Sequence, residues 1–79
     1  MDNNEKYTQL FMDVFMIERD EVPSLTYQSI QNWDSVGHMR LIASLEEAFD
    51  IMMDTDDIID LSSFEKGKEI LAKYDVEFD

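Results

Sequence analysis

The chain has 79 residues, with 19 Asp and Glu against six Lys and Arg, a formal net charge of −13 and no cysteine. This length allows one small domain, residues 1–79, and an apolar fraction of 44% is too high for a disordered acidic tail. The charge argues against nucleic acid and anionic membrane surfaces as partners, and the lack of cysteine excludes disulfides and thiolate sites.

The first residues show neither the basic nor the apolar segment of a secretory signal, and no run approaches the ~20 apolar residues of a membrane span. We therefore expect a cytoplasmic protein without membrane insertion. A monomer is the default expectation, and the acidic surface predicts basic proteins as partners.

Apolar residues recur at helical spacing near the start of the chain, which predicts a first helix from about Glu5 to Ile17; they are Tyr7, Leu10, Phe11, Val14 and Phe15. A connection from Glu18 to Asp34 follows. A connection of this length usually has a function or a short turn of its own. Five of its apolar side chains can dock inward: Val22, Leu25, Tyr27, Ile30 and Trp33.

A second helix is expected from Ser35 to about Phe49, with two distinct apolar faces. The core stripe consists of Leu41, Ile42, Leu45, Ala48 and Phe49. The other face holds Ser35 together with Val36, Met39, Ala43, Glu46 and Glu47. We interpret this second face as a docking surface for a partner; the alternative is a set of ordinary surface residues or of contacts to the long connection.

Two further helices complete the expected fold. Asp54, Thr55, Asp56 and Asp57 supply a cap and first-turn charges for a very short third helix through Ile58 and Ile59. Ser62 and Glu65 match a capping box that opens a last helix, which continues to Tyr74. The sequence thus predicts an all-α fold, a small four-helix bundle with one short helix.

Ser35 is the candidate functional residue because it stands at the start of the second helix. Exposed backbone N–H groups and the positive end of the helix dipole favour a phosphate ester at this position. The alternative is a serine that only caps the helix, although Asp34 can do this alone. The spacing leaves both interpretations open.

Other chemistry is less well supported. Asp34, Ser35 and His38 lie within one helical turn, where a catalytic triad cannot easily form, so His38 is expected to be a partly buried polar residue. The aspartates from Asp54 to Asp60 lack the glycine and closing glutamate of an EF-hand loop. Glu46 and Glu47 are adjacent and diverge on an exposed helix face, which favours a solvated or partner-binding role over acid–base catalysis.

Several runs extend over nearly the whole chain: Asp34-Ser35-Val36, Leu41-Ile42, Leu45-Glu46-Glu47-Ala48-Phe49-Asp50, Asp56-Asp57-Ile58 and Ser62-Ser63-Phe64. Together they resemble the acyl carrier protein family, whose members are also called phosphopantetheine-binding or thiolation domains. The block from Trp33 to Asp50 is the most specific part.

The resemblance implies that Ser35, with Asp34 as part of its motif, receives 4′-phosphopantetheine from coenzyme A. A separate magnesium-dependent phosphopantetheinyl transferase, the holo-acyl-carrier-protein synthase, transfers it. The thiol of the arm then carries an acyl or aminoacyl group as a thioester, and the carrier itself catalyses nothing. The resemblance also assigns Val36, Met39, Glu46 and Glu47 to recognition by loading and transfer enzymes with basic patches.

Some positions depart from the common fatty-acid carrier pattern. Val36 replaces the usual Leu, Gly37 and Arg40 replace positions that are typically acidic, and Ala43 replaces the usual Met. These departures resemble standalone carriers of specialised pathways, with fatty acid, lipid, polyketide, polysaccharide-modifying or aminoacyl cargo. The alternative is an unmodified acidic interaction module, such as an inhibitor or nucleic-acid mimic, that does not need Ser35.

Overall fold

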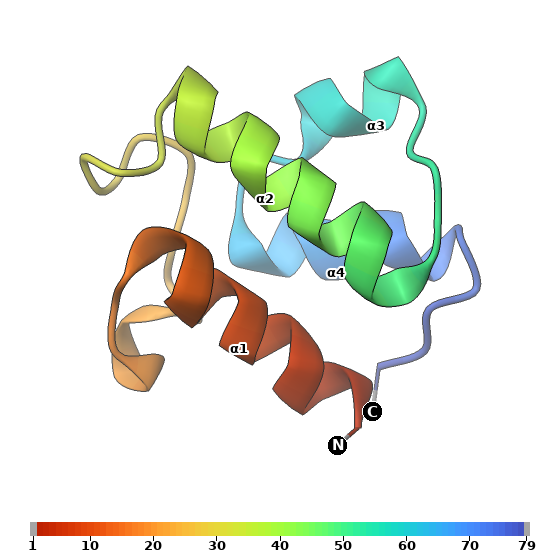
Figure 1. Cartoon of the computed structure of the whole chain (residues 1–79), viewed down its shortest axis with the longest axis horizontal. Coiled ribbons are helices and arrows are strands. Elements are labelled where there is room, and N and C mark those ends of the chain that lie inside the picture. The colour runs from red at the N-terminus through yellow and green to blue at the C-terminus, as the bar shows by residue number, and fades with distance from the viewer. Residues whose placement is uncertain (1, 79) are drawn as a thin grey trace.

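Regular structure in the computed structural model, which describes residues 2–78, is helical (Figure 1). The elements are, in chain order, α1 (Asn3–Phe15), the 3₁₀ helix η1 (Arg19–Glu21), α2 (Ser35–Phe49), α3 (Thr55–Asp60) and α4 (Phe64–Ala72). This confirms the expected all-α bundle with one short helix. Met1 and Asp79, which belong to the expected domain, lie outside the described residues.

The first helix begins and ends two residues earlier than the periodicity indicated. Asp2 caps α1, because its carboxylate accepts the N–H of Glu5 at 2.8 Å. The helix ends at Phe15 because Met16 adopts the left-handed conformation, with φ at 57°. Ile17, the expected end, therefore lies outside α1, since one left-handed residue interrupts the helical hydrogen bonds.

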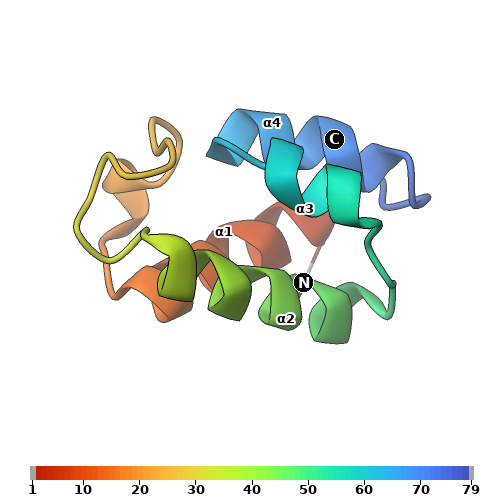
Figure 2. The ribbon, with the colours of Figure 1, turned by 90° about the horizontal axis from the view of Figure 1, so that it is seen from above.

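The second helix has the expected bounds. The carboxylate of Asp34 accepts the N–H of Gly37 at 2.9 Å and so caps α2, while Asp50 ends the helix in a left-handed conformation, with φ at 55°. From its start, α2 runs back alongside α1, as both views show (Figures 1 and 2). The connection between them includes η1, the short turn that its length suggested.

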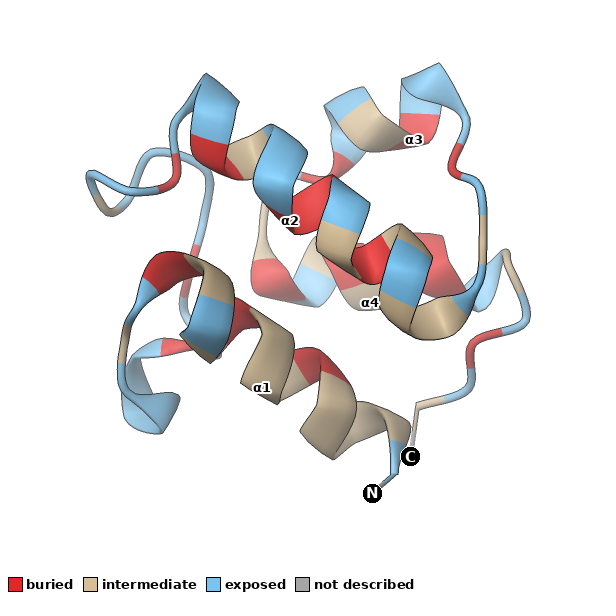
Figure 3. Cartoon of the chain, in the orientation of Figure 1, coloured by how far each residue is buried: buried red, intermediate tan, exposed pale blue. Residues whose placement is uncertain are grey.

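Aromatic side chains dominate the core between the helices. Phe11 lies at its centre, with ring centroids 5.7 Å from Trp33 and 5.0 Å from Phe64. The buried hydroxyl of Tyr7 donates to the Phe64 carbonyl at 2.7 Å, which links α1 to α4. Buried residues lie on the inward sides of the helices, and exposed ones follow the outer side of α2 (Figure 3).

Most of the inward-docking side chains expected in the connection are buried, but two are not. Val22, Leu25 and Trp33 are at most 4% exposed. Ile30 is only half-buried, and Tyr27 is 36% exposed.

The expected core stripe of α2 is buried in part: its first three members are fully buried, and Ala48 and Phe49, near the helix end, are half-buried.

The expected capping box at Ser62 is wrong. Ser63 caps α4, because its hydroxyl accepts the N–H of Lys66 at 2.9 Å. The Ser62 carbonyl accepts the N–H of Tyr27 at 2.8 Å, and the N–H of Phe64 donates to Leu25. This pairing with the connection keeps Ser63 extended, so the helix starts after it, at Phe64. The helix also ends at Ala72, before Tyr74, which lies in a turn.

A buried carboxylate attaches α3 to α4. Asp57, expected as a first-turn charge, is 7% exposed and accepts hydrogen bonds of 2.5 Å from the Lys73 ammonium and the Tyr74 hydroxyl. These two hydrogen bonds lower the pKa of Asp57. Asp54 is the N-cap residue as expected, but its side chain makes no capping hydrogen bond; its N–H donates to Tyr74.

Candidate functional site

Ser35 is the first residue of α2 and is exposed to solvent. Within residues 2–78 its hydroxyl takes part in no hydrogen bond, because Asp34 supplies the cap instead. Of the two interpretations that the sequence left open, the structure assigns helix capping to Asp34 and leaves the Ser35 hydroxyl available for chemistry.

The backbone around Ser35 presents free donors. The N–H groups of Gly37 and His38 both bond to Asp34, through its carboxylate and its carbonyl. The N–H groups of Ser35 and Val36 have no hydrogen-bond partner within the described part of the chain. They point from the positive end of a 15-residue helix, so an anion attached to Ser35 lies in a favourable field.

An open hollow of about 390 Å³, here called the Ser35 groove, lies between α2 and α3 beside this serine. No Asp, Glu, Lys or Arg side chain lines it. Its lining residues are Tyr27, Ser35, His38, Met39, Ile58, Ile59, Leu61 and Ser62. A group attached to Ser35 therefore begins at the edge of an apolar surface.

His38 connects three segments through its two ring nitrogens. Its Nδ1 lies 3.0 Å from the indole nitrogen of Trp33, and its Nε2 lies 2.7 Å from the Ile58 carbonyl oxygen. Because an indole N–H can only donate, Nδ1 must accept, and the ring proton is then on Nε2, which donates to Ile58. We call this pair of hydrogen bonds the His38 bridge. His38 is half-buried, as expected.

The same contacts show that Asp34, Ser35 and His38 do not form a triad. Both nitrogens of His38 are engaged in the bridge, and the Asp34 carboxylate is engaged with Gly37. Neither a general base nor an orienting acid is thus directed at the Ser35 hydroxyl.

The docking face expected on α2 is exposed over most of its length. Val36 and Met39 are 65% and 54% exposed, and Ala43 and Glu47 are also exposed. Glu46 differs, because it is half-buried and its carboxylate accepts the N–H of Met53 at 2.9 Å. Glu46 therefore has a structural role in the connection after α2 that the sequence did not reveal.

The third helix contributes a side chain that the sequence analysis did not assign to the site. Ile59 is 71% exposed and lines the Ser35 groove. No local sequence signal distinguished Ile59 from a core residue, since neighbouring apolar residues of a helix can both be buried, as Leu41 and Ile42 are in α2. Ile59 extends the exposed apolar surface of Val36 and Met39 from α2 onto α3.

Arg40 and Gly37, two of the positions that differ from the common fatty-acid carrier pattern, have structural explanations. The Arg40 guanidinium lies within 3.5 Å of the Val14 carbonyl, in the last turn of α1, where a cation is favourable and α1 has none of its own. Gly37 faces the Asn32 carbonyl closely, and Asn32 in turn donates to the Phe15 carbonyl at 3.0 Å. These contacts fix the approach of the chain to Ser35.

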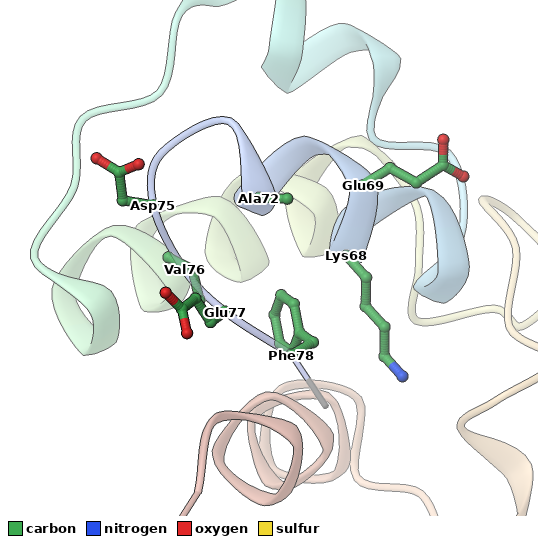
Figure 4. Close-up of a pocket in the computed structure, with 7 residues that line it drawn as sticks. All are labelled: Lys68, Glu69, Ala72, Asp75, Val76, Glu77 and Phe78. Carbon is green, nitrogen blue, oxygen red and sulfur yellow. The ribbon is translucent and has the colours of Figure 1, made fainter.

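A second hollow, of about 610 Å³, lies between α4 and the C-terminal segment (Figure 4). Its lining mixes charges of both signs with Val76 and Phe78, and the carboxylates of Glu69 and Asp75 point away from each other. It contains no serine or histidine. Among the described residues, no group of three or more acidic or histidine side chains could hold a metal ion.

Comparison with known proteins identified no relative: no protein-family model, no curated protein and no solved structure matches the chain. In the part of the chain that the structure describes, no helix combines the length and the apolar character needed to cross a membrane. The fold and the site define a small all-α bundle whose longest helix begins with an exposed serine and is capped by the residue before it, Asp34.

Proposed function

We propose that the protein is an acyl carrier protein, modified on Ser35 with 4′-phosphopantetheine. The observation that carries this proposal concerns Ser35, the exposed first residue of α2. Its hydroxyl is not used to cap the helix, because Asp34 is the cap. The sequence motif and the four-helix arrangement support the same function.

The surroundings of Ser35 fit the phosphopantetheine group. The free N–H groups of Ser35 and Val36 suit its phosphate, which is an anion at neutral pH. The Ser35 groove, which no Asp, Glu, Lys or Arg side chain lines, suits the apolar part of the arm next to that phosphate. When bound, the group supplies a thiol that carries acyl or aminoacyl groups as thioesters, which accounts for a thiol carrier without cysteine.

The partners would be a phosphopantetheinyl transferase and the enzymes that load and unload the carrier. The exposed apolar side chains of Met39 and Ile59 line the groove beside Ser35, and exposed Val36 follows Ser35 in the chain. Glu47 provides charge on the same helix. Basic patches on these enzymes would be attracted by the net charge of −13. Such complexes form fast and depend on salt, which suits a protein that visits several enzymes.

The proposal is tested by intact mass after incubation with coenzyme A, Mg²⁺ and a transferase of broad specificity. We expect the mass of one phosphopantetheine group to be added to the wild type and none to Ser35→Ala. Ser62→Ala is the matched control, because Ser62 is an exposed serine that lines the same groove, and it should load like the wild type. If the folded wild type gains no mass with several transferases, the acidic interaction module becomes the better account.

A further inference from the structure

The inner end of the Ser35 groove is blocked by side chains that fill the core. Leu61 lines the groove and is 1% exposed. The buried ring of Trp33 packs against His38 and Tyr27, which also line the groove. Its centroid lies 6.2 Å from that of the His38 ring and 6.3 Å from that of the Tyr27 ring. Trp33 itself stacks on Phe15 at 5.1 Å. The groove therefore ends at packed aromatic rings.

The His38 bridge holds the two walls of the groove together. The Ile58 carbonyl belongs to the last turn of α3, where carbonyl groups lack partners within the helix, and His38 supplies its partner. The Trp33 indole N–H is buried and has His38 as its acceptor. Separating α3 from α2 would thus break the hydrogen bond between His38 and Ile58. If His38 then moved, the buried indole N–H of Trp33 would lose its acceptor, which is unfavourable.

We propose that Ser35 carries short or polar acyl groups that stay outside the bundle, because the His38 bridge closes the groove against the core. This inference rests on the proposed function. His38 is a positioning residue: it acts through Trp33 and Ile58 and does not react. The occupant of the groove is the apolar part of the arm that begins at Ser35, which lines the groove itself.

The class of cargo follows from the hydration of the acyl chain. With the groove closed on its inner side, a long alkyl chain on the arm would remain in water, which is unfavourable in proportion to its apolar area. A short acyl group, or one with hydroxyl or amino groups, has little apolar area to hide. The carrier would therefore serve enzymes that transfer small or polar acyl groups.

The test loads the protein with acetyl-, hexanoyl- or dodecanoyl-phosphopantetheine from the corresponding acyl-coenzyme A, and confirms each product by mass. The unfolding temperature and the fluorescence of Trp33, the one tryptophan of the chain, are then compared between cargoes. For the wild type we expect both to be independent of chain length. A dodecanoyl form that unfolds at a higher temperature and shifts the Trp33 emission relative to the acetyl form would overturn the proposal.

Variants test the part that His38 plays. His38→Ala removes the hydrogen bond that ties α2 to Ile58 of α3, so the walls can separate and we expect the dodecanoyl form to become more stable than the acetyl form. His38→Gln can still accept from Trp33 and donate to Ile58, and should behave like the wild type. Met52→Ala, which removes an exposed methionine outside both the groove and the bridge, should also show no dependence on chain length. Equal stability of the two His38→Ala forms would contradict the role of His38.

If His38→Ala does not fold, His38→Gln and the wild type still decide the question, through nuclear Overhauser contacts between acyl protons and the Trp33 ring. Such contacts in the dodecanoyl wild type would refute the inference, and their absence would support it. Failure to gain acyl-phosphopantetheine mass in any form would instead refute the carrier function.

Discussion

The carbonyl oxygen of Asn32 occupies the space in which a side chain on Gly37 would begin, since a Cβ there would lie 2.0 Å from it. The same residue, Asn32, is tied to the end of α1 through the Phe15 carbonyl. The last residues of the connection are thus pressed onto the first turn of α2. Ser35 lies between these two contacting residues, so its position depends on the absence of a side chain at Gly37.

Gly37→Ala should therefore destabilise the fold and disturb the site. We expect a loss of about 1–3 kcal/mol in the free energy of unfolding, because a backbone carbonyl cannot move aside cheaply. Urea denaturation measures this loss, and transferase kinetics should show slower loading. Ser44→Ala, in the same helix, is the control and should change the stability by less than about 0.5 kcal/mol. A Gly37→Ala variant as stable as the wild type would show that the connection does not constrain α2.

The buried carboxylate of Asp57 makes the stability depend on pH. Hydrogen bonds from Lys73 and Tyr74 lower the pKa of Asp57 in the folded protein. A lowered pKa means that the contribution is complete above the pKa of an unfolded aspartate, about 3.9, and is lost as the pH falls through the lower folded value. Asp57→Asn should thus be less stable than the wild type at pH 7.

The difference between the two proteins is expected to shrink as the pH is lowered below about 4. Denaturant unfolding at a series of pH values measures it. Asp56→Asn is the control, because Asp56 is an exposed neighbour in the same helix turn, and its difference from the wild type should be small throughout. If the difference for Asp57→Asn persisted unchanged to the lowest pH, the ion pair with Lys73 would not be its cause.

The two glutamates of the docking face should behave differently. Glu47 is exposed, so Glu47→Lys should leave the stability within about 0.5 kcal/mol of the wild type. Loading by the transferase at low salt should slow by about three- to tenfold, because the exposed charge steers the encounter. Glu46→Ala should lower the stability by about 1 kcal/mol, since it removes the acceptor of the Met53 N–H. Loading of Glu47→Lys at the wild-type rate would remove Glu47 from the docking face.

Local signals were sufficient to predict α2. Asp34 precedes it as a capping residue and its apolar pattern has a helical period, both within the segment itself. The start of α4 could not be predicted in this way. The choice of Ser63 over Ser62 as its cap depends on backbone pairing with Thr26 and its neighbours, which lie far away in the sequence.

Some features of the candidate site could likewise be predicted from the sequence and others could not. The exposed position of Ser35 and the capping role of Asp34 follow from residues that are adjacent in the chain. The His38 bridge could not be predicted, because its carbonyl partner comes from α3, 20 residues away. The contact of Asp57 with Lys73 could not be predicted for the same reason, because Lys73 follows the end of α4, 16 residues away.

The measurement that tests the central claim most directly is the location of the added group. The protein loaded by the transferase is cleaved into peptides, and fragmentation mass spectrometry identifies the residue that carries the phosphopantetheine. We expect the modification on Ser35 alone, with the other exposed serines, Ser24, Ser29 and Ser62, unmodified. Modification of any of those three serines, or of none, would contradict the assignment of Ser35 as the attachment site of a carrier.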